Sequence, residues 1–230
     1  MGSTPTSPTT GTGNPDMVFT LCKNHDSALS KTFKAVVADL NGFYGLDWWH
    51  GLPRVFIMPD RKTIDALSEK KTERWVIGFN DGRYVFLLDN ESMEKESQHS
   101  KRSQREYTAL LKHEMSHAFF DKLANGCHIP RWLNEGVAIF VSGQLQVKGR
   151  PEKLMTCLDY FRTGGQGIYA EAGFAVKALV EIYGRKKLLQ LIKDLYPEIS
   201  RGAFKKLFKK IYGFAPTYKN LNQTYARIEK

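Results

Sequence analysis

The feature that most constrains this chain is the sequence HEMSH at residues 113–117, which is followed, after seventeen more residues, by Glu135. Residues four apart on an α-helix project from nearly the same face, so the rings of His113 and His117 can point at one metal ion. Imidazole nitrogens and carboxylate oxygens are ligands of zinc, and a catalytic zinc keeps one coordination position for water. The pattern therefore predicts a zinc site formed by His113, His117 and Glu135.

The glutamate between the two histidines, Glu114, lies beside the predicted ion without being able to serve as a straightforward ligand. A carboxylate in this place can take a proton from a water on the metal and later return it to the leaving group. A chance HExxH is expected only roughly 0.01 times in a chain of this composition, and the spaced glutamate makes coincidence rarer still. We therefore expect Glu114 to be a general base rather than a residue of an ordinary exposed helix.

The residues around the motif predict two helices. Residues 104–123 contain neither Gly nor Pro and carry apolar side chains at helical spacing, and Asn-Gly at 125–126 supplies a stop signal. Pro130 precedes a second helix, predicted at 131–144, which would carry Glu135 antiparallel to the first helix.

The chain has HExxH followed, after seventeen residues, by the glutamate of WLNEGVA (132–138). This pattern resembles that of the gluzincins, which are zinc peptidases of the MA clan with a thermolysin-like catalytic domain. WLNEGVA is most similar to the aminopeptidase-type members, and residues 169–195 and 203–216 are similar to the helical tail of small bacterial members. The resemblance implies an α+β fold: a thermolysin-like zincin catalytic domain with a small mixed α/β N-terminal lobe, a β-hairpin edge and a helical C-terminal lobe. It also implies Zn²⁺ as the cofactor and a peptide or protein as the substrate.

By this resemblance His113, His117 and Glu135 are the zinc ligands and Glu114 is the general base. The Gly-x-Met-Glu-Asn motif that anchors a free substrate N-terminus in the aminopeptidases is absent, so we expect an endopeptidase or a narrow-specificity processing peptidase. Ile139 stands where thermolysin-type members have an aspartate that orients a zinc histidine. The partner of that histidine must therefore come from elsewhere in this chain.

A donor to the oxyanion is the remaining catalytic group that we expect. Tyr169 follows the glycine-rich residues 164–167 and occupies the place of a recurrent tyrosine in the small family members, so the resemblance assigns it this role. The alternative is that Tyr169 is a core or interface tyrosine, in which case Tyr160 is the substitute.

The residues before the motif predict a mixed α/β lobe. We expect helices at 28–40 and 61–71, a short strand at 55–58, and a hairpin whose strands, 75–79 and 84–88, flank Asn-Asp-Gly. Val85 to Leu88 is predicted as an edge strand that pairs with an extended substrate, the alternative being a hairpin that only covers the core. The polar residues 89–103 predict a mobile loop.

The residues after the motif predict helices at 152–161, 170–183, 186–195 and 204–212. The last of these has an apolar stripe opposite four lysines, and a solvated lysine face is favoured over a membrane or nucleic-acid surface because no aromatic interleaving accompanies it. The formal charge of +10 predicts attraction to acidic substrates or surfaces rather than a particular reaction.

At 230 residues, 42% of them apolar, the chain is long enough for one two-lobed domain, predicted at 17–230 with lobes at 17–124 and 125–230. Residues 1–16 have almost nothing to bury and predict a disordered linker or a segment added for expression. No stretch reaches the roughly 20 apolar residues of a membrane helix. We expect a monomer without a nucleic-acid partner, either cytoplasmic or extracytoplasmic with its signal peptide removed.

The three cysteines do not predict a disulfide framework. Cys22 and His25 form a lone C-x2-H with no second pair to complete a metal site, and Cys127 with His128 is predicted as loop packing between the two ligand-bearing helices. Zinc-dependent hydrolysis of peptide bonds, with Glu114 activating a zinc-bound water, is the function that these features predict. The alternative is a catalytically inactive zinc-binding or basic surface-binding module on a zincin fold.

Overall fold

The computed structural model describes residues 19, 23, 27–165 and 167–228. The predictions for residues 1–16 and for Cys22 with His25 lie outside these residues. The described chain is mixed α/β and mostly helical, with a three-stranded sheet. Its helices are α1 (Ser27–Tyr44), α2 (Arg61–Leu67), α3 (Met93–Glu96), α4 (Gln104–Leu123), α5 (Arg131–Ser142), α6 (Ile168–Tyr183), α7 (Arg185–Lys193), α8 (Arg201–Tyr212) and α9 (Tyr218–Tyr225), and its strands are β1 (Arg54–Met58), β2 (Gly78–Asp81) and β3 (Tyr84–Leu88).

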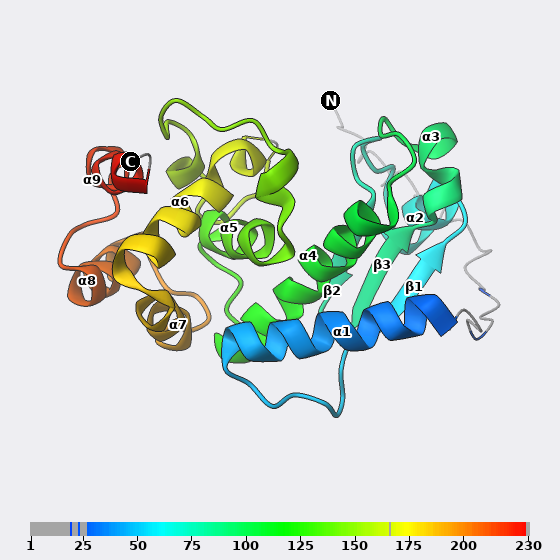
Figure 1. The fold of residues 1–230 in the computed structure, drawn as a ribbon, viewed down its shortest axis with the longest axis horizontal. Helices are drawn as coiled ribbons and strands as arrows, with labels where there is room; N and C mark the ends of the chain where they lie inside the picture. Colours follow the sequence, from blue (N-terminus) through cyan, green and yellow to red (C-terminus); the bar gives the residue numbers. More distant parts are fainter. Residues whose placement is uncertain (1–18, 20–22, 24–26, 166, 229–230) are drawn as a thin grey trace, which may run out of the picture.

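Helix α4 lies between the two parts of the molecule (Figure 1). The sheet lies on one side of it with α2 and α3, and helices α6 to α9 lie on the other. Helix α4 contacts α1, α5 and β2. Because α4 carries residues 113–117 and contacts both β2 and α5, this position places the motif between the sheet and α5.

The sheet has the strand order β1-β3-β2, with β1 parallel and β2 antiparallel to β3. The predicted hairpin is confirmed, but its first strand is Gly78–Asp81 rather than 75–79, because Asn80 and Asp81 pair with Val85 and Tyr84 instead of forming the turn. Gly82 (φ 54°) supplies the left-handed conformation of the turn. The prediction that Val85 to Leu88 form an edge strand is wrong, because β1 pairs with the far side of β3 and makes it the central strand. The buried Val85, Leu87 and Leu88 agree with a central place, and β2 is an edge of the sheet.

Helix α4 has the bounds that the sequence predicts. Ser103 and Glu106 form a capping box at its start, and Asn125 and Gly126 adopt positive φ just after its end. The predicted second helix is α5, which begins at Arg131 as expected and ends two residues earlier than predicted, before Gly143 in the left-handed conformation. The two helices that carry the motif residues are therefore both present.

Helices α5 and α6 pack closely because glycines lie at their crossing. A Cβ at Gly136 would lie 2.6 Å from the carbonyl oxygen of Ala172, and a Cβ at Gly173 would lie 2.4 Å from Cγ2 of Ile139. Both distances are shorter than any real side chain tolerates, so the close approach requires glycine at both positions. Ile139 therefore has a packing role against α6, where the thermolysin-type pattern has an aspartate.

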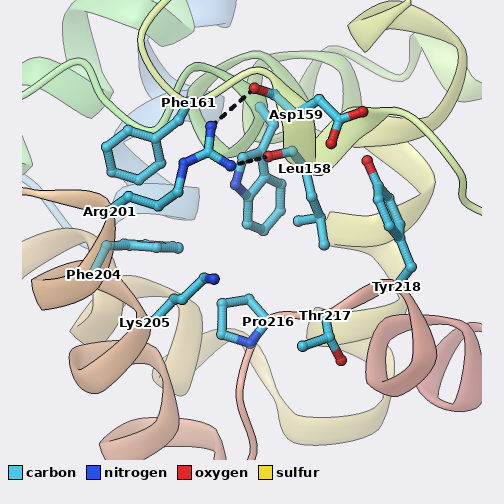
Figure 2. A pocket seen from close by; sticks show the side chains of 10 residues that line it. Leu158, Asp159, Phe161, Arg201, Phe204, Lys205, Pro216, Thr217 and Tyr218 are labelled. Atoms are coloured by element: carbon cyan, nitrogen blue, oxygen red, sulfur yellow. Dashed lines mark hydrogen bonds between the residues drawn. The ribbon is translucent and has the colours of Figure 1, made fainter.

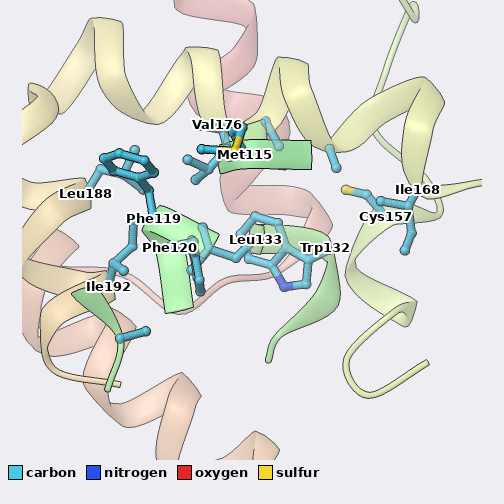
Figure 3. Close-up of a cluster of buried hydrophobic side chains, with 14 of the residues drawn as sticks. Met115, Phe119, Phe120, Trp132, Leu133, Cys157, Ile168, Val176, Leu188 and Ile192 are labelled. Carbon is cyan, nitrogen blue, oxygen red and sulfur yellow. The ribbon is translucent and has the colours of Figure 1, made fainter. Parts of the chain in front are cut away.

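The core is continuous across these helices (Figure 3). Its labelled members include Met115, Phe119 and Phe120 of α4, Trp132 and Leu133 of α5, Val176 of α6, and Leu188 and Ile192 of α7. Each of these side chains is 0–1% exposed and belongs to one cluster of buried apolar residues. The core thus fixes α4 and α5 relative to each other, and with them the motif residues.

Two segments differ from their predictions because polar side chains form hydrogen bonds with their backbone. Residues 89–103 were expected to be a mobile loop, but they contain α3, bury Met93, and are held by hydrogen bonds between the side chain of Asn90 and the backbone of Arg102. The predicted helix at 152–161 is not formed beyond a single 3₁₀ turn, because the carboxylate of Glu171 accepts hydrogen bonds from the backbone N–H groups of residues 155–157. Helix α2 is also shorter than predicted, and α9 was not predicted.

None of the helices in the described residues combines the length and apolar character needed to cross a membrane.

Candidate metal centre

Three potential ligand atoms converge between α4 and α5. Nε2 of His113 lies 3.3 Å from Nε2 of His117. Oε2 of Glu135 lies 3.4 Å from the first of these nitrogens and 3.6 Å from the second. One helical turn separates the two histidines on α4, and the packing of α5 against α4 brings in Glu135. The structure therefore brings together all three residues that the sequence predicts as ligands.

These separations suit a single metal ion. A tetrahedral ion with bond lengths of roughly 2.0–2.1 Å, as in zinc sites, holds its ligand atoms roughly 3.3–3.4 Å apart. The side chain of Glu135 is 3% exposed, and among the described residues its Oε2 has no hydrogen-bond partner. A buried carboxylate oxygen without a partner is costly, and a cation held between it and the two rings would satisfy it. The cluster can thus hold a metal ion.

Asn134 supplies the hydrogen-bond partner of His117, a partner that the sequence pattern left unassigned. Its Oδ1 lies 2.6 Å from Nδ1 of His117. An amide oxygen only accepts, so Nδ1 of His117 carries the proton and its Nε2 keeps a free lone pair toward the cluster. Asn134 is buried and directly precedes Glu135 in the chain. The only signal for this role in the sequence is a polar residue beside the ligand glutamate in an apolar helix.

Electrostatics in the metal-free protein favour the ligand forms of His117 and Glu135, whereas for His113 burial lowers the pKa but Glu135 and Glu114 outweigh it and raise the pKa, so that a metal would have to displace a proton from this ring. Burial lowers the pKa of His117 to about 4, which leaves the ring neutral. Burial alone would raise the pKa of Glu135, but the two histidines and Arg131 outweigh it and bring the pKa to about 2. The guanidinium of Arg131 donates to Oε1 of Glu135 at 2.8 Å and leaves Oε2 facing the histidines. Neutral imidazole and ionised carboxylate are the forms that bind a metal.

Glu114 is a buried acid beside the cluster. Burial raises its pKa to about 7 in the metal-free protein. A Cβ at Gly78 would lie 3.1 Å from Oε1 of Glu114 and 2.9 Å from Cδ2 of Leu87, so β2 approaches the carboxylate closely only because this position is glycine. Gly78 was not singled out from the sequence, although a glycine inside a strand is a signal of such close approach.

The structure distinguishes between the two tyrosines. The ring of Tyr169 lies 6.5 Å from the ring of His113, and Tyr169 lines the same cavity as His113 and Glu114. Burial raises the pKa of Tyr169, and the carboxylates of the site raise it further, so the phenol stays protonated and can donate a hydrogen bond. Tyr160 instead packs its ring against Gly165 and Gly167, away from the cavity lining.

A cavity of about 1400 Å³ opens onto the cluster. Its wall includes residues 75–78, which lead into the edge strand β2. The volume exceeds the roughly 300–1,000 Å³ of typical small-molecule pockets, and a free strand edge offers backbone groups for pairing. The cavity therefore suits an extended chain more than a compact small molecule.

A second, smaller cavity of about 220 Å³ lies on the helical side of the molecule (Figure 2). Arg201 crosses it, donates to the carbonyl oxygens of Leu158 and Asp159, and lies over the ring of Phe161. None of the cluster residues lines this cavity. It therefore does not contribute to the candidate metal centre.

The remaining cysteine and histidine predictions are resolved by position. Cys127 is buried and its thiol donates to the carbonyl oxygen of Ile129, while His128 is exposed, so this pair packs the loop as expected. Cys157 is also buried, and neither thiol approaches the cluster.

No family model, no curated protein and no solved structure matches this chain.

Proposed function

We propose that this protein is a zinc-dependent hydrolase of peptide bonds, of the gluzincin type and with a thermolysin-like catalytic domain. The observation that carries the proposal is the placement of three ligand atoms at tetrahedral separations, with the buried carboxylate of Glu114 beside them in a large open cavity. A purely structural zinc site uses four protein ligands, whereas the three here would leave a position open.

In this proposal His113, His117 and Glu135 hold Zn²⁺. The ion, when bound, supplies Lewis-acid polarisation and lowers the pKa of a water in the site. Glu114 accepts the proton of the attacking water and transfers it to the leaving amine, a role for which a pKa near neutrality is well matched. Tyr169 donates a hydrogen bond to the oxyanion of the tetrahedral intermediate.

The substrate in this proposal is an extended peptide that pairs with the free edge of β2. Strand β2 replaces Val85 to Leu88 in this role, because β3 has partners on both of its sides. The cavity joins residues 75–78 to Glu114, so a peptide on this edge would present a carbonyl group near the cluster. Since the motif for a free amino terminus is absent, we propose cleavage within a chain rather than removal of N-terminal residues.

The first test is the zinc content of the wild type and of Glu135→Ala, both purified without added metal. About one zinc per chain, lost or much weakened in the variant, is the expected result. Absence of zinc from the wild type, even after reconstitution, would overturn the proposed centre.

The second test separates catalysis from metal binding. Zinc-loaded wild type is expected to cleave members of a quenched-fluorescence peptide library, and Glu114→Gln is expected to keep its zinc and lose roughly 10²–10⁴-fold in rate. Zinc in both proteins with no cleavage by either would instead identify a metal-binding module without hydrolase activity.

A further inference from the structure

Two cations lie on the wall of the large cavity beside the metal centre. Lys148 follows the short 3₁₀ segment Gln144–Val147, and Arg102 precedes the capping box of α4. Both line the cavity that contains His113 and Glu114, and both are partly buried. They are close enough for Arg102 to lower the pKa of Lys148, after burial as the larger cause.

These two cations lack a full set of anionic partners. In the described part of the chain Lys148 forms no ion pair. In the same part of the chain, Nε of Arg102 is buried without a hydrogen-bond partner and its Nη2 lies 3.5 Å from Nδ1 of His99. Its Nη1 lies 3.8 Å from Oε1 of Glu106, whose other oxygen, Oε2, accepts hydrogen bonds from the backbone N–H and the hydroxyl of Ser103 at 3.0 Å and 2.7 Å.

The other two long cations on the same wall have closer polar partners. Lys112 lies 3.0 Å from a carboxylate oxygen of Asp39, and Arg105 donates to the neutral side chain of Gln146. A pair of like charges, partly desolvated and short of counter-charge, raises the free energy of the empty cleft. An anion bound between Arg102 and Lys148 would lower it.

The distance between Lys148 and the proposed metal centre indicates which molecule could supply such an anion. Its ammonium lies 5.9 Å from the ring centroid of Tyr169, and that ring lies 6.5 Å from the ring of His113. An extended peptide spans roughly 3.3–3.6 Å per residue, so these contacts place the ammonium within roughly four residue lengths of the His113 ring. A group on the same bound peptide can therefore reach Lys148.

We propose that Arg102 and Lys148 form a subsite for a carboxylate of the peptide substrate, so that the enzyme prefers peptides carrying an acidic group a few residues from the cleaved bond. This proposal rests on the proposed peptidase function and names its substrate class. The guanidinium of Arg102 can donate a charge-assisted hydrogen bond to a carboxylate, and the ammonium of Lys148 adds a point charge. The carboxylate belongs either to an Asp or Glu side chain or to the C-terminus of a peptide.

The test is a positional peptide library with capped amino termini, prepared with free and with amidated carboxyl termini. Wild type is expected to cleave peptides with Asp or Glu at one position about tenfold better, in kcat/KM, than peptides with Asn or Gln there.

Lys148→Met, which keeps an unbranched chain of similar length, is expected to lose that preference through KM while retaining cleavage of the neutral peptides. Lys148→Glu is expected to reverse it toward Lys and Arg. Lys153→Met, an exposed lysine outside the cavity, is the matched control and is expected to behave as wild type.

The outcomes separate this subsite from the peptidase function. A preference that appears only with free carboxyl termini assigns the subsite to a terminal carboxylate, and one that persists in amidated peptides assigns it to a side chain. Cleavage with equal rates for acidic and neutral peptides, or a preference unchanged in Lys148→Met, overturns the subsite and leaves the peptidase standing. If wild type cleaves no peptide, the peptidase proposal fails, and equal binding of acidic and neutral peptides to zinc-loaded Glu114→Gln then overturns the subsite as well.

Discussion

Oδ1 of Asn134 lies 2.6 Å from Nδ1 of His117 and so fixes which nitrogen of that ring faces the metal centre. Asn134 and Glu135 are neighbours on α5, and one segment of this helix thus supplies both a proposed ligand and the group that orients another. The adjacency ties the geometry of the centre to the packing of α5 against α4, rather than to a separate loop.

Replacing Asn134 tests this relationship. Asn134→Ala removes the acceptor of the Nδ1–H and frees the ring to rotate, so we expect zinc affinity to fall by about 10–100-fold, as for other partners of metal-bound histidines. Competition with a chromophoric chelator measures this. Asn222→Ala, which removes an amide that bonds the backbone of Leu154, is the control: it is expected to lower stability and leave zinc affinity unchanged. Equal affinities of Asn134→Ala and wild type would contradict the assignment.

Gly78 provides a second test, directed at Glu114 rather than at the metal. The Cβ of Gly78→Ala would lie 3.1 Å from Oε1 of Glu114 and 2.9 Å from Cδ2 of Leu87, so the carboxylate must shift. We expect kcat to fall by at least about tenfold, because the position of a general base controls proton transfer. Zinc content is expected to stay near one per chain.

Gly42→Ala is the matched control for that variant, since nothing lies within 4 Å of a Cβ at Gly42. It is expected to leave kcat unchanged. A Gly78→Ala variant with wild-type kcat would show that Glu114 is not held in place by the approach of β2.

The crossing of α5 and α6 gives a prediction about stability. A Cβ in Gly136→Ala would lie 2.6 Å from the carbonyl oxygen of Ala172 and 2.8 Å from Cγ2 of Val176, so α5 must move away from α6. We expect the free energy of unfolding to fall by about 1–3 kcal/mol, as for other overpacked cores. Urea denaturation measures it, and Gly202→Ala, whose nearest neighbour is 3.9 Å away, is expected to change it far less.

The sequence predicts the parts of the site that depend on local pattern. Helix α4 agrees at both bounds because its periodicity and its stop signal lie in one continuous stretch, and the two histidines follow from its turn length. Glu135 was found because its spacing resembles a family pattern, and the structure brings it to the histidines.

The predictions that were wrong concern elements whose structure depends on contacts between residues far apart in the sequence. Whether β3 is an edge or a central strand is decided by the pairing of β1 along its far side, which no feature within residues 84–88 reveals. Likewise, residues 152–161 have helical periodicity, but the carboxylate of Glu171 captures three of their N–H groups. The roles of Gly78 and Asn134 also required knowing which elements lie opposite them.

The pKa of Glu114 leads to a prediction about the pH dependence of stability in the metal-free protein. Burial raises this pKa from 4.5 to about 7 in the folded state. The folded protein therefore retains the proton between these pH values while the unfolded chain has lost it. The contribution of Glu114 to stability is fully present below pH 4.5 and is lost as the pH rises to about 7.

Glu114→Gln stays neutral at every pH and does not suffer this loss. In the presence of a chelator, we expect the free energy of unfolding of the variant, relative to wild type, to rise between pH 4.5 and pH 8 by on the order of 3 kcal/mol. The opposite contribution of His117, whose pKa burial lowers to about 4, is common to both proteins and cancels in the difference. The contribution of His113 does not cancel in this way, because its pKa, which burial lowers, is raised in part by the carboxylate of Glu114. Urea denaturation at the two pH values measures it, with Glu94→Gln, an exposed glutamate on α3, as the control for removal of one carboxylate. A difference that does not change with pH would show that Glu114 titrates in the folded metal-free protein as it does in the unfolded chain, and that another group offsets the effect of burial on its pKa.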